Sequence, residues 1–127
     1  DALVGGEGAD TLIGWRQADT MTGGEGDDLF LFLSQLDSSV ANPDEITDFV
    51  RGEDKISLAF DADRTTPGVQ DFAFTTLPFA ANAPGFFRVE SVDPNTVLVL
   101  ANTDADADAE FALIVRGVST LDASDFI

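Results

Sequence analysis

The chain has 127 residues, of which 44% are apolar, and this is enough to form the core of one modest domain. Its 24 acidic and 6 basic residues give a formal net charge of −18, which argues against binding to nucleic acid or to an anionic membrane surface. Cysteine and histidine are both absent, which excludes disulfides, thiolate metal sites and the commonest general base. No apolar run approaches the roughly 18 residues that cross a bilayer, so we expect no membrane insertion.

The N-terminal quarter of the chain contains a nonapeptide repeat, Gly-Gly-x-Gly-x-Asp-x-U-x, in which U is a large apolar residue. The pattern is complete at residues 5–13 and 23–31. The middle copy, residues 14–22, keeps its first glycine, its aspartate and its apolar residue, but Trp15 and Gln17 occupy two glycine positions. This pattern is typical of a calcium-binding parallel β-helix.

The spacing of two residue types supports the same interpretation. Aspartates recur every nine positions, and so do large apolar residues. The aspartates are Asp1, Asp10, Asp19, Asp28 and Asp37, and the apolar residues are Leu3, Leu12, Met21 and Phe30. Two nonapeptides form one coil of about 18 residues. We therefore expect Asp10 and Asp28 to stack on one side of the coil, and Asp1, Asp19 and Asp37 on the other.

The residue types suit calcium chemistry. Glycine adopts positive φ values without steric cost, so the chain can turn tightly and direct its carbonyl oxygens inward. Ca²⁺ is a hard cation that takes six to eight oxygen ligands, and the aspartates add charged oxygens. We predict the best-formed site between residues 5–10 and 23–28. The candidate metal ligands are Gly5, Gly6, Glu7, Gly8, Asp10, Asp19, Gly23, Gly24, Glu25, Gly26, Asp28, Asp37 and Asp48.

Some of these candidates have a second interpretation. Glu7 and Glu25 are expected to contribute carbonyl oxygens, with their carboxylates in solvent. Asp37 falls in the nine-residue register with Asp19, and the sequence favours calcium binding by Asp37 no more than the absence of binding. Asp48, and Asp44 near it, either help to close the last turn of the roll or cap a turn. No residue is predicted to be catalytic, because adjacent carboxylates such as Asp27 and Asp28 would point to opposite faces of a strand.

The remainder of the chain predicts short strands and turns. Residues 29–33 read as the last strand of the coil, and residues 44–58 as two short strands joined by a turn. Residues 86–91, 96–101 and 110–116 are rich in β-branched and aromatic residues and favour an antiparallel sheet. The predicted fold class is therefore all-β, a short parallel β-roll (residues 1–36) capped by an antiparallel β-sandwich (residues 37–127).

Two further features have competing interpretations. Asp104, Asp106, Asp108 and Glu110 alternate like the start of an EF-hand loop, but the later EF-hand positions carry Ala109 and Val115, so a solvated acidic hairpin is favoured. Trp15 is interpreted as a surface or packing residue, with a stacking platform for a sugar as the alternative.

Several segments together resemble the C-terminal part of serralysin-type RTX exoproteins. They are Asp37-Ser38, residues 44–49, residues 52–56, residues 104–111 and residues 121–126. The resemblance implies a calcium β-roll with a β-sandwich cap, downstream of a catalytic or binding domain. It also implies export by a type I secretion apparatus, an ABC transporter, through a C-terminal signal that Asp125-Phe126-Ile127 resembles. Without histidine the chain lacks the zinc protease motif, so no peptidase activity is carried over.

These observations predict a non-catalytic module of a larger, secreted, extracellular protein, which folds when it binds Ca²⁺ after export. The chain opens in the middle of a repeat, and this also suggests the tail of a longer protein. One alternative is a carbohydrate-binding module, which would need a basic groove for a polyuronate, whereas the six basic residues are scattered. Another is a structural module of a cell-surface adhesin.

Overall fold

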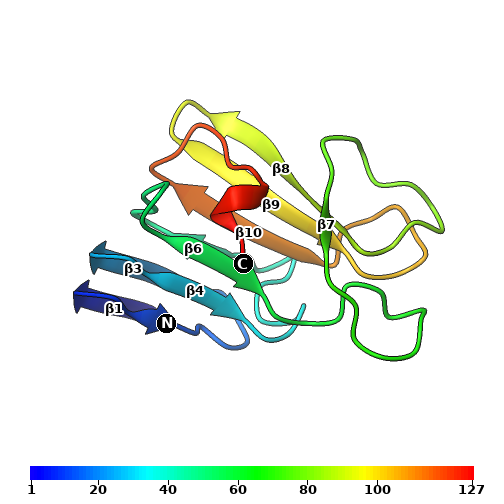
Figure 1. The fold of residues 1–127 in the computed structure, drawn as a ribbon, viewed down its shortest axis with the longest axis horizontal. Coiled ribbons are helices and arrows are strands. Elements are labelled where there is room, and N and C mark those ends of the chain that lie inside the picture. Colours follow the sequence, from blue (N-terminus) through cyan, green and yellow to red (C-terminus); the bar gives the residue numbers. More distant parts are fainter.

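A computed structural model describes all of residues 1–127 and contains two β-sheets (Figure 1). The larger sheet has the strand order β1-β3-β5-β10-β9-β8-β7, and the smaller has the order β2-β4-β6. The strands are β1 (Ala2–Glu7), β2 (Thr11–Leu12), β3 (Thr20–Glu25), β4 (Leu29–Phe32), β5 (Asp44–Ile46), β6 (Lys55–Leu58), β7 (Ala73–Phe74), β8 (Phe86–Asp93), β9 (Thr96–Asn102) and β10 (Phe111–Arg116). The all-β prediction is confirmed. The single 3₁₀ helix, Ala123–Asp125, is far too short to cross a membrane.

The nonapeptides form a parallel coil with the expected period. In the larger sheet Leu3 lies opposite Met21, and in the smaller sheet Leu12 lies opposite Phe30. The two residues of each pair are 18 positions apart in the sequence, so two nonapeptides make one coil. The U residues face the interior: Leu12, Met21 and Phe30 are buried, and Leu3 at the open end packs partly against the core.

The coil continues beyond the recognisable repeats. Strand β5 pairs in parallel with β3, and β6 pairs in parallel with β4, so a third coil stacks on the first two. The prediction that residues 29–33 form the last strand is therefore wrong, because β4 is the central strand of its sheet. Parallel pairing thus extends past residue 36, where the sequence predicted the cap to begin. The two-part division of the chain itself stays a prediction.

The cap is the antiparallel sheet that the sequence predicted. Strands β8, β9 and β10 pair as consecutive antiparallel neighbours. Strand β10 also pairs in parallel with β5, so the cap and the third coil share one continuous sheet. This junction explains why the larger sheet has seven strands.

The hydrophobic core joins the roll to the cap. Its members come from the coil strands and from the inward faces of β8 to β10. The largest fully buried side chains include Phe30, Phe32, Phe49, Phe111, Met21, Ile46, Ile56 and Leu113. Phe32 of the coil meets Phe111 of the cap edge-to-face, with ring centroids 5.2 Å apart. Burying each of these side chains contributes about 1.5–3 kcal/mol, so the roll and the cap stabilise each other.

Candidate calcium sites in the turns of the roll

The turns of the coil have the backbone conformation for which glycine is suited. In the two complete repeats, Gly6, Gly8, Gly24 and Gly26 have φ values of 118°, 103°, 105° and 130°. In the incomplete repeat the corresponding residues, Trp15 and Gln17, also have positive φ values, of 67° and 92°. The turn of the middle repeat thus keeps its shape although it lacks these two glycines, at a steric cost that glycine would avoid.

On one side of the roll, aspartates from successive turns stack through their backbone amides. The amide of Asp10 donates to Oδ1 of Asp28 at 2.9 Å. The amide of Asp28 in turn donates to Oδ1 of Asp54 at 3.1 Å. Asp10 and Asp28 therefore stack as predicted, and the stack extends by one residue that the nonapeptide count did not include.

On the other side, Asp44 occupies the position that was expected for Asp37. The amide of Asp19 donates to Oδ1 of Asp44 at 2.9 Å. Asp37 instead accepts hydrogen bonds from the amides of Leu33 and Ser34, at 2.9 and 3.0 Å, and so caps a local turn. The predicted register of Asp37 is wrong because the connection between β4 and β5 is longer than the corresponding connection between β2 and β3.

The stacked aspartates share a second pattern besides the nine-residue spacing. Each stands two positions before an apolar residue of the interior. The triplets in the third coil are Asp44-Glu45-Ile46 and Asp54-Lys55-Ile56, with both isoleucines fully buried. Asp37 is followed by two serines and lacks such a partner. The Asp-x-apolar triplet thus includes Asp44 and Asp54, which the fixed spacing missed. The same triplet also occurs at Asp48-Phe49-Val50, whose valine is exposed, so the structure is needed to choose among the triplets.

Four stacked carboxylates each contain a buried oxygen without a hydrogen-bond partner. These atoms are Oδ2 of Asp10, Asp28, Asp19 and Asp44. Two belong to one stack and two to the other. A buried polar atom without a partner costs free energy, more so when it is charged, so these four oxygens are the candidates to contact a bound ion.

The space beside these oxygens exists only because glycine stands there. A Cβ placed on Gly5 would lie 2.7 Å from Oδ2 of Asp10, and one on Gly14 would lie 2.9 Å from Oδ2 of Asp19. At Gly23 the added atom would overlap Oδ2 of Asp28. Orphaned carboxylate oxygens that face glycine backbone in tight turns fit an ion with oxygen ligands, and thus fit Ca²⁺.

Three other predicted site residues, Glu7, Glu25 and Asp48, lie outside the two aspartate stacks. The Glu7 and Glu25 side chains are exposed, and the carbonyl of Glu25 accepts a hydrogen bond from the amide of Gly8 at 2.6 Å. Asp48 uses both carboxylate oxygens to accept the amides of Gly23 and Gly24, each at 2.9 Å. Its contacts are thus those of a cap on the neighbouring turn, one of the two roles expected for it.

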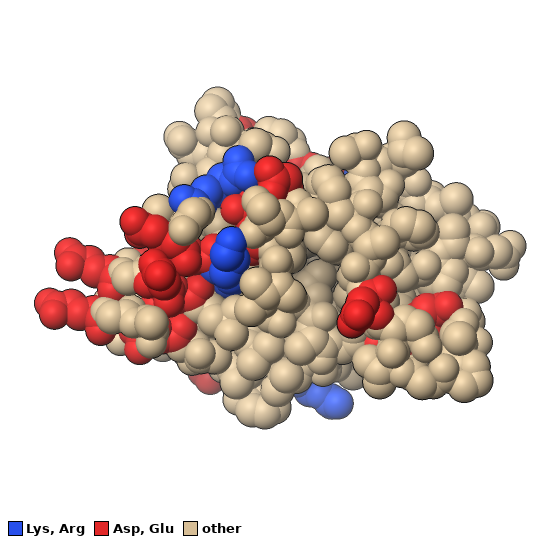
Figure 2. All heavy atoms as spheres, viewed as in Figure 1, with Lys and Arg blue, Asp and Glu red and all other residues tan.

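Burial and mutual repulsion affect the stacked carboxylates. Desolvation raises the pKa of Asp44 to about 7, and the negative charges of Asp19 and Asp37 act in the same direction. Burial likewise raises the pKa of Asp54. Figure 2 shows acidic side chains gathered at the end of the molecule where β1 and β3 finish. This accumulation of charge at the turns would be relieved by a bound cation.

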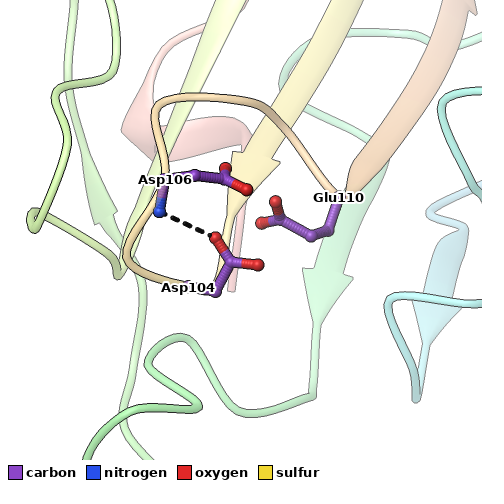
Figure 3. Close-up of side chains that lie close together, drawn as sticks. All are labelled: Asp104, Asp106 and Glu110. Carbon is purple, nitrogen blue, oxygen red and sulfur yellow. Dashed lines mark hydrogen bonds between the residues drawn. The ribbon is translucent and has the colours of Figure 1, made fainter.

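The acidic hairpin between β9 and β10 has a different structure. Residues 103–110 form a loop between two antiparallel strands, as the acidic-hairpin interpretation predicted. The loop brings oxygens of Asp104, Asp106 and Glu110 within 4.8 Å of one another (Figure 3). Glu110 accepts the amide of Thr103 at 2.6 Å, and burial raises its pKa. No carboxylate oxygen of this loop is buried without a partner, in contrast to those of the roll.

The fold and the turns define a parallel β-roll module with stacked carboxylates. The family model described as peptidase M10 serralysin C terminal matches residues 1–127. The chain belongs to this family, which is the calcium-binding, RTX-type C-terminal part of secreted proteins and not their catalytic part. The resemblance seen in the sequence is confirmed.

Two solved structures have a similar fold. The AlgE6R3 subunit of the mannuronan C5-epimerase from Azotobacter vinelandii is 22% identical, with a TM-score of 0.68, over 100% of this chain and 67% of that chain. The AlgE6R2 subunit of the same enzyme is 24% identical, with a TM-score of 0.55, over 100% of this chain and 86% of that chain. No curated protein matches the sequence.

Proposed function

We propose that the turns of the roll bind Ca²⁺ between successive coils and that binding drives folding. The observation that carries the proposal is the set of four buried carboxylate oxygens without partners, arranged in two stacks. Because the chain has neither cysteine nor histidine, its available metal ligands are mainly carboxylate and carbonyl oxygens, which Ca²⁺ prefers. The proposed ligand set consists of the predicted glycine-rich turns with Asp10, Asp19, Asp28 and Asp44, with Asp37 and Asp48 as supporting residues of neighbouring turns.

The coupling to folding follows from the charge of the chain. With a net charge of −18, carboxylates brought together in the coil repel one another. A bound cation neutralises that repulsion, and because the site requires two folded turns, binding free energy becomes folding free energy. The roll would thus be poorly ordered where calcium is scarce and folded where it is abundant.

This behaviour suits a module of an exported protein. A chain that stays unfolded in low calcium can pass through a type I secretion apparatus and fold outside the cell, where calcium is plentiful. The C-terminal residues would engage the ABC transporter, and an upstream domain would contribute the activity of the parent protein. Membership of the serralysin C-terminal family supports this proposal.

Binding of a polyuronate receives less support. Four of the six basic side chains contact other groups of the chain: Arg51 binds Asp122, Lys55 binds the carbonyl of Ser124, Arg88 binds Glu90 and Arg116 binds Glu45. Arg16 and Arg64 remain without a side-chain ion pair. We therefore favour the calcium module over a module that binds a polyuronate.

The proposal is tested by far-UV circular dichroism while calcium is titrated into the calcium-stripped chain. We expect a cooperative gain of β signal and a large rise in Tm, with magnesium as the matched control that produces much less. If the stripped chain has the full β spectrum and calcium changes neither the spectrum nor the Tm, the proposal is wrong.

A further inference from the structure

The turn of residues 48–54 is the outermost turn of the roll on its side, and it is tied to the turn before it. Asp48 accepts two backbone amides of residues 23–28, both at 2.9 Å. Asp54 accepts a third amide, that of Asp28, at 3.1 Å. The position of residues 48–54 therefore sets the spacing between these two turns.

The tip of the same turn contacts the last residues of the chain. Arg51 donates through Nε to both carboxylate oxygens of Asp125, at 3.2 and 3.0 Å, and through Nη2 to Asp122 at 2.8 Å. Just after the turn, Nζ of Lys55 donates to the carbonyl of Ser124 at 2.6 Å. Arg51 and Lys55, which flank Asp54 in the sequence, thus bind residues 121–127. We call these residues the closing segment.

The Asp125 carboxylate depends on this contact. Its side chain is only 3% exposed, and apart from Arg51 it accepts only the amide of Asp122, at 2.9 Å. The rest of the closing segment lies against the third coil and the cap: the amide of Ile127 donates to Ile56 at 3.0 Å, and the rings of Phe126 and Phe87 are 4.4 Å apart. If Arg51 moved away, a buried carboxylate would lose its cation, which is strongly destabilising.

We propose that Arg51 is a positioning residue that couples calcium binding between residues 23–28 and 48–54 to docking of the closing segment. This inference rests on the proposed calcium function. An ion between the two turns orders residues 48–54 and so fixes Arg51 where Asp122 and Asp125 meet it. By thermodynamic reciprocity, the docked closing segment raises calcium affinity by the same factor.

The consequence is a calcium-dependent exposure of the C-terminal residues. Where calcium is scarce, the turn loses order, Arg51 no longer holds the closing segment, and residues 121–127 become accessible. Where calcium saturates the roll, the same residues are held against β6 and the cap.

The experiment measures calcium affinity by isothermal titration and amide hydrogen exchange of residues 121–127 at saturating calcium, using the full chain. Arg51→Gln is compared with the matched control Arg116→Gln, which breaks the ion pair between Arg116 of β10 and Glu45 of the third coil without touching the closing segment. We expect Arg51→Gln to weaken calcium binding by about fivefold or more and to speed exchange in the closing segment. In both variants the amides of β8 and β9 should stay protected, which shows that the fold is intact.

A second variant distinguishes a loss of coupling from a general loss of stability. Asp125→Asn should reproduce the loss of affinity, and the double variant with Arg51→Gln should be no weaker than the worse single variant, because both changes remove one contact. If the wild-type chain binds calcium but Arg51→Gln binds it as tightly as Arg116→Gln does, the coupling is refuted and the calcium function stands. If the wild-type chain binds no calcium, both proposals are wrong.

Discussion

The backbone amide of Asp19 donates a hydrogen bond of 2.9 Å to Asp44, 25 positions further along the chain. The equivalent bond on the other side, from Asp10 to Asp28, spans 18 positions. The longer connection before Asp44 is inserted without disturbing the stack, because the strand that follows returns Ile46 to its place opposite Met21. The carboxylate stack therefore follows the register of the buried residues and not the number of residues in the loop.

This relationship predicts that replacing Asp44 and replacing Asp37 have different effects on calcium affinity. Asp44→Asn removes the charge beside the buried oxygen of Asp19, and we expect calcium affinity on that side of the roll to fall by at least about tenfold. Asp37→Asn leaves an oxygen that still accepts the amides of Leu33 and Ser34, so affinity should change little. Equilibrium dialysis of both variants measures the difference. Equal losses in the two variants would mean that Asp37 also holds an ion.

The pH dependence of stability should reverse with calcium. Burial raises the pKa of Asp44 from 3.8 to about 7, so in the calcium-free chain the folded state holds this proton more tightly than the unfolded state. The resulting stabilisation is complete below the unfolded pKa and is lost as the pH rises through about 7. The calcium-stripped chain should therefore melt at a higher temperature at pH 5 than at pH 8.

In saturating calcium the order of the two melting temperatures should be the opposite, since the ion requires the deprotonated carboxylate. Calorimetric scans at both pH values test this, and Asp44→Asn serves as the control, because it removes the Asp44 contribution in the calcium-free chain. A calcium-free chain whose Tm is independent of pH would contradict the assignment.

Two glycines with similar φ values should respond differently to alanine. A Cβ at Gly24 would overlap the carbonyl oxygen of Gly6 in the adjacent turn, whereas a Cβ at Gly6 meets nothing within 4 Å. Gly6→Ala should cost about 1–2 kcal/mol for its positive φ alone. Gly24→Ala should cost about 1–3 kcal/mol more, because the turns must separate. Urea unfolding in saturating calcium compares the two, and equal costs would show that the turns are free to separate.

Restoring a glycine in the incomplete repeat should increase the stability of the fold. Gln17 has a φ of 92° and is exposed, so Gln17→Gly removes steric strain and little packing. We expect a gain of up to about 1 kcal/mol in the free energy of unfolding. The neighbouring Arg16 is also exposed but lacks a positive φ, so Arg16→Gly should instead cost about 0.5–1 kcal/mol. A loss of stability in Gln17→Gly would indicate that its side chain has a role in the turn.

The sequence by itself determined the coil and the chemistry of its turns. The glycine positions, the Asp10 and Asp28 stack and the inward-facing Leu12, Met21 and Phe30 all follow from local preference and a constant period. Each of these features depends on residues within one nonapeptide or on its neighbour 18 positions away. A repeated pattern is therefore sufficient to predict them.

The tertiary structure alone decided which residues continue the stacks and what holds the end of the chain. Asp44 and Asp54 join the stacks because Ile46 and Ile56 are buried in the core, opposite Met21 and Phe30 of the second coil. The loops before them differ in length from those of the repeats, so counting residues does not predict this register. The contact between Arg51 and Asp125 joins residues 74 positions apart. No periodicity marks such a pair, because it forms only when the core brings the third coil and the closing segment together.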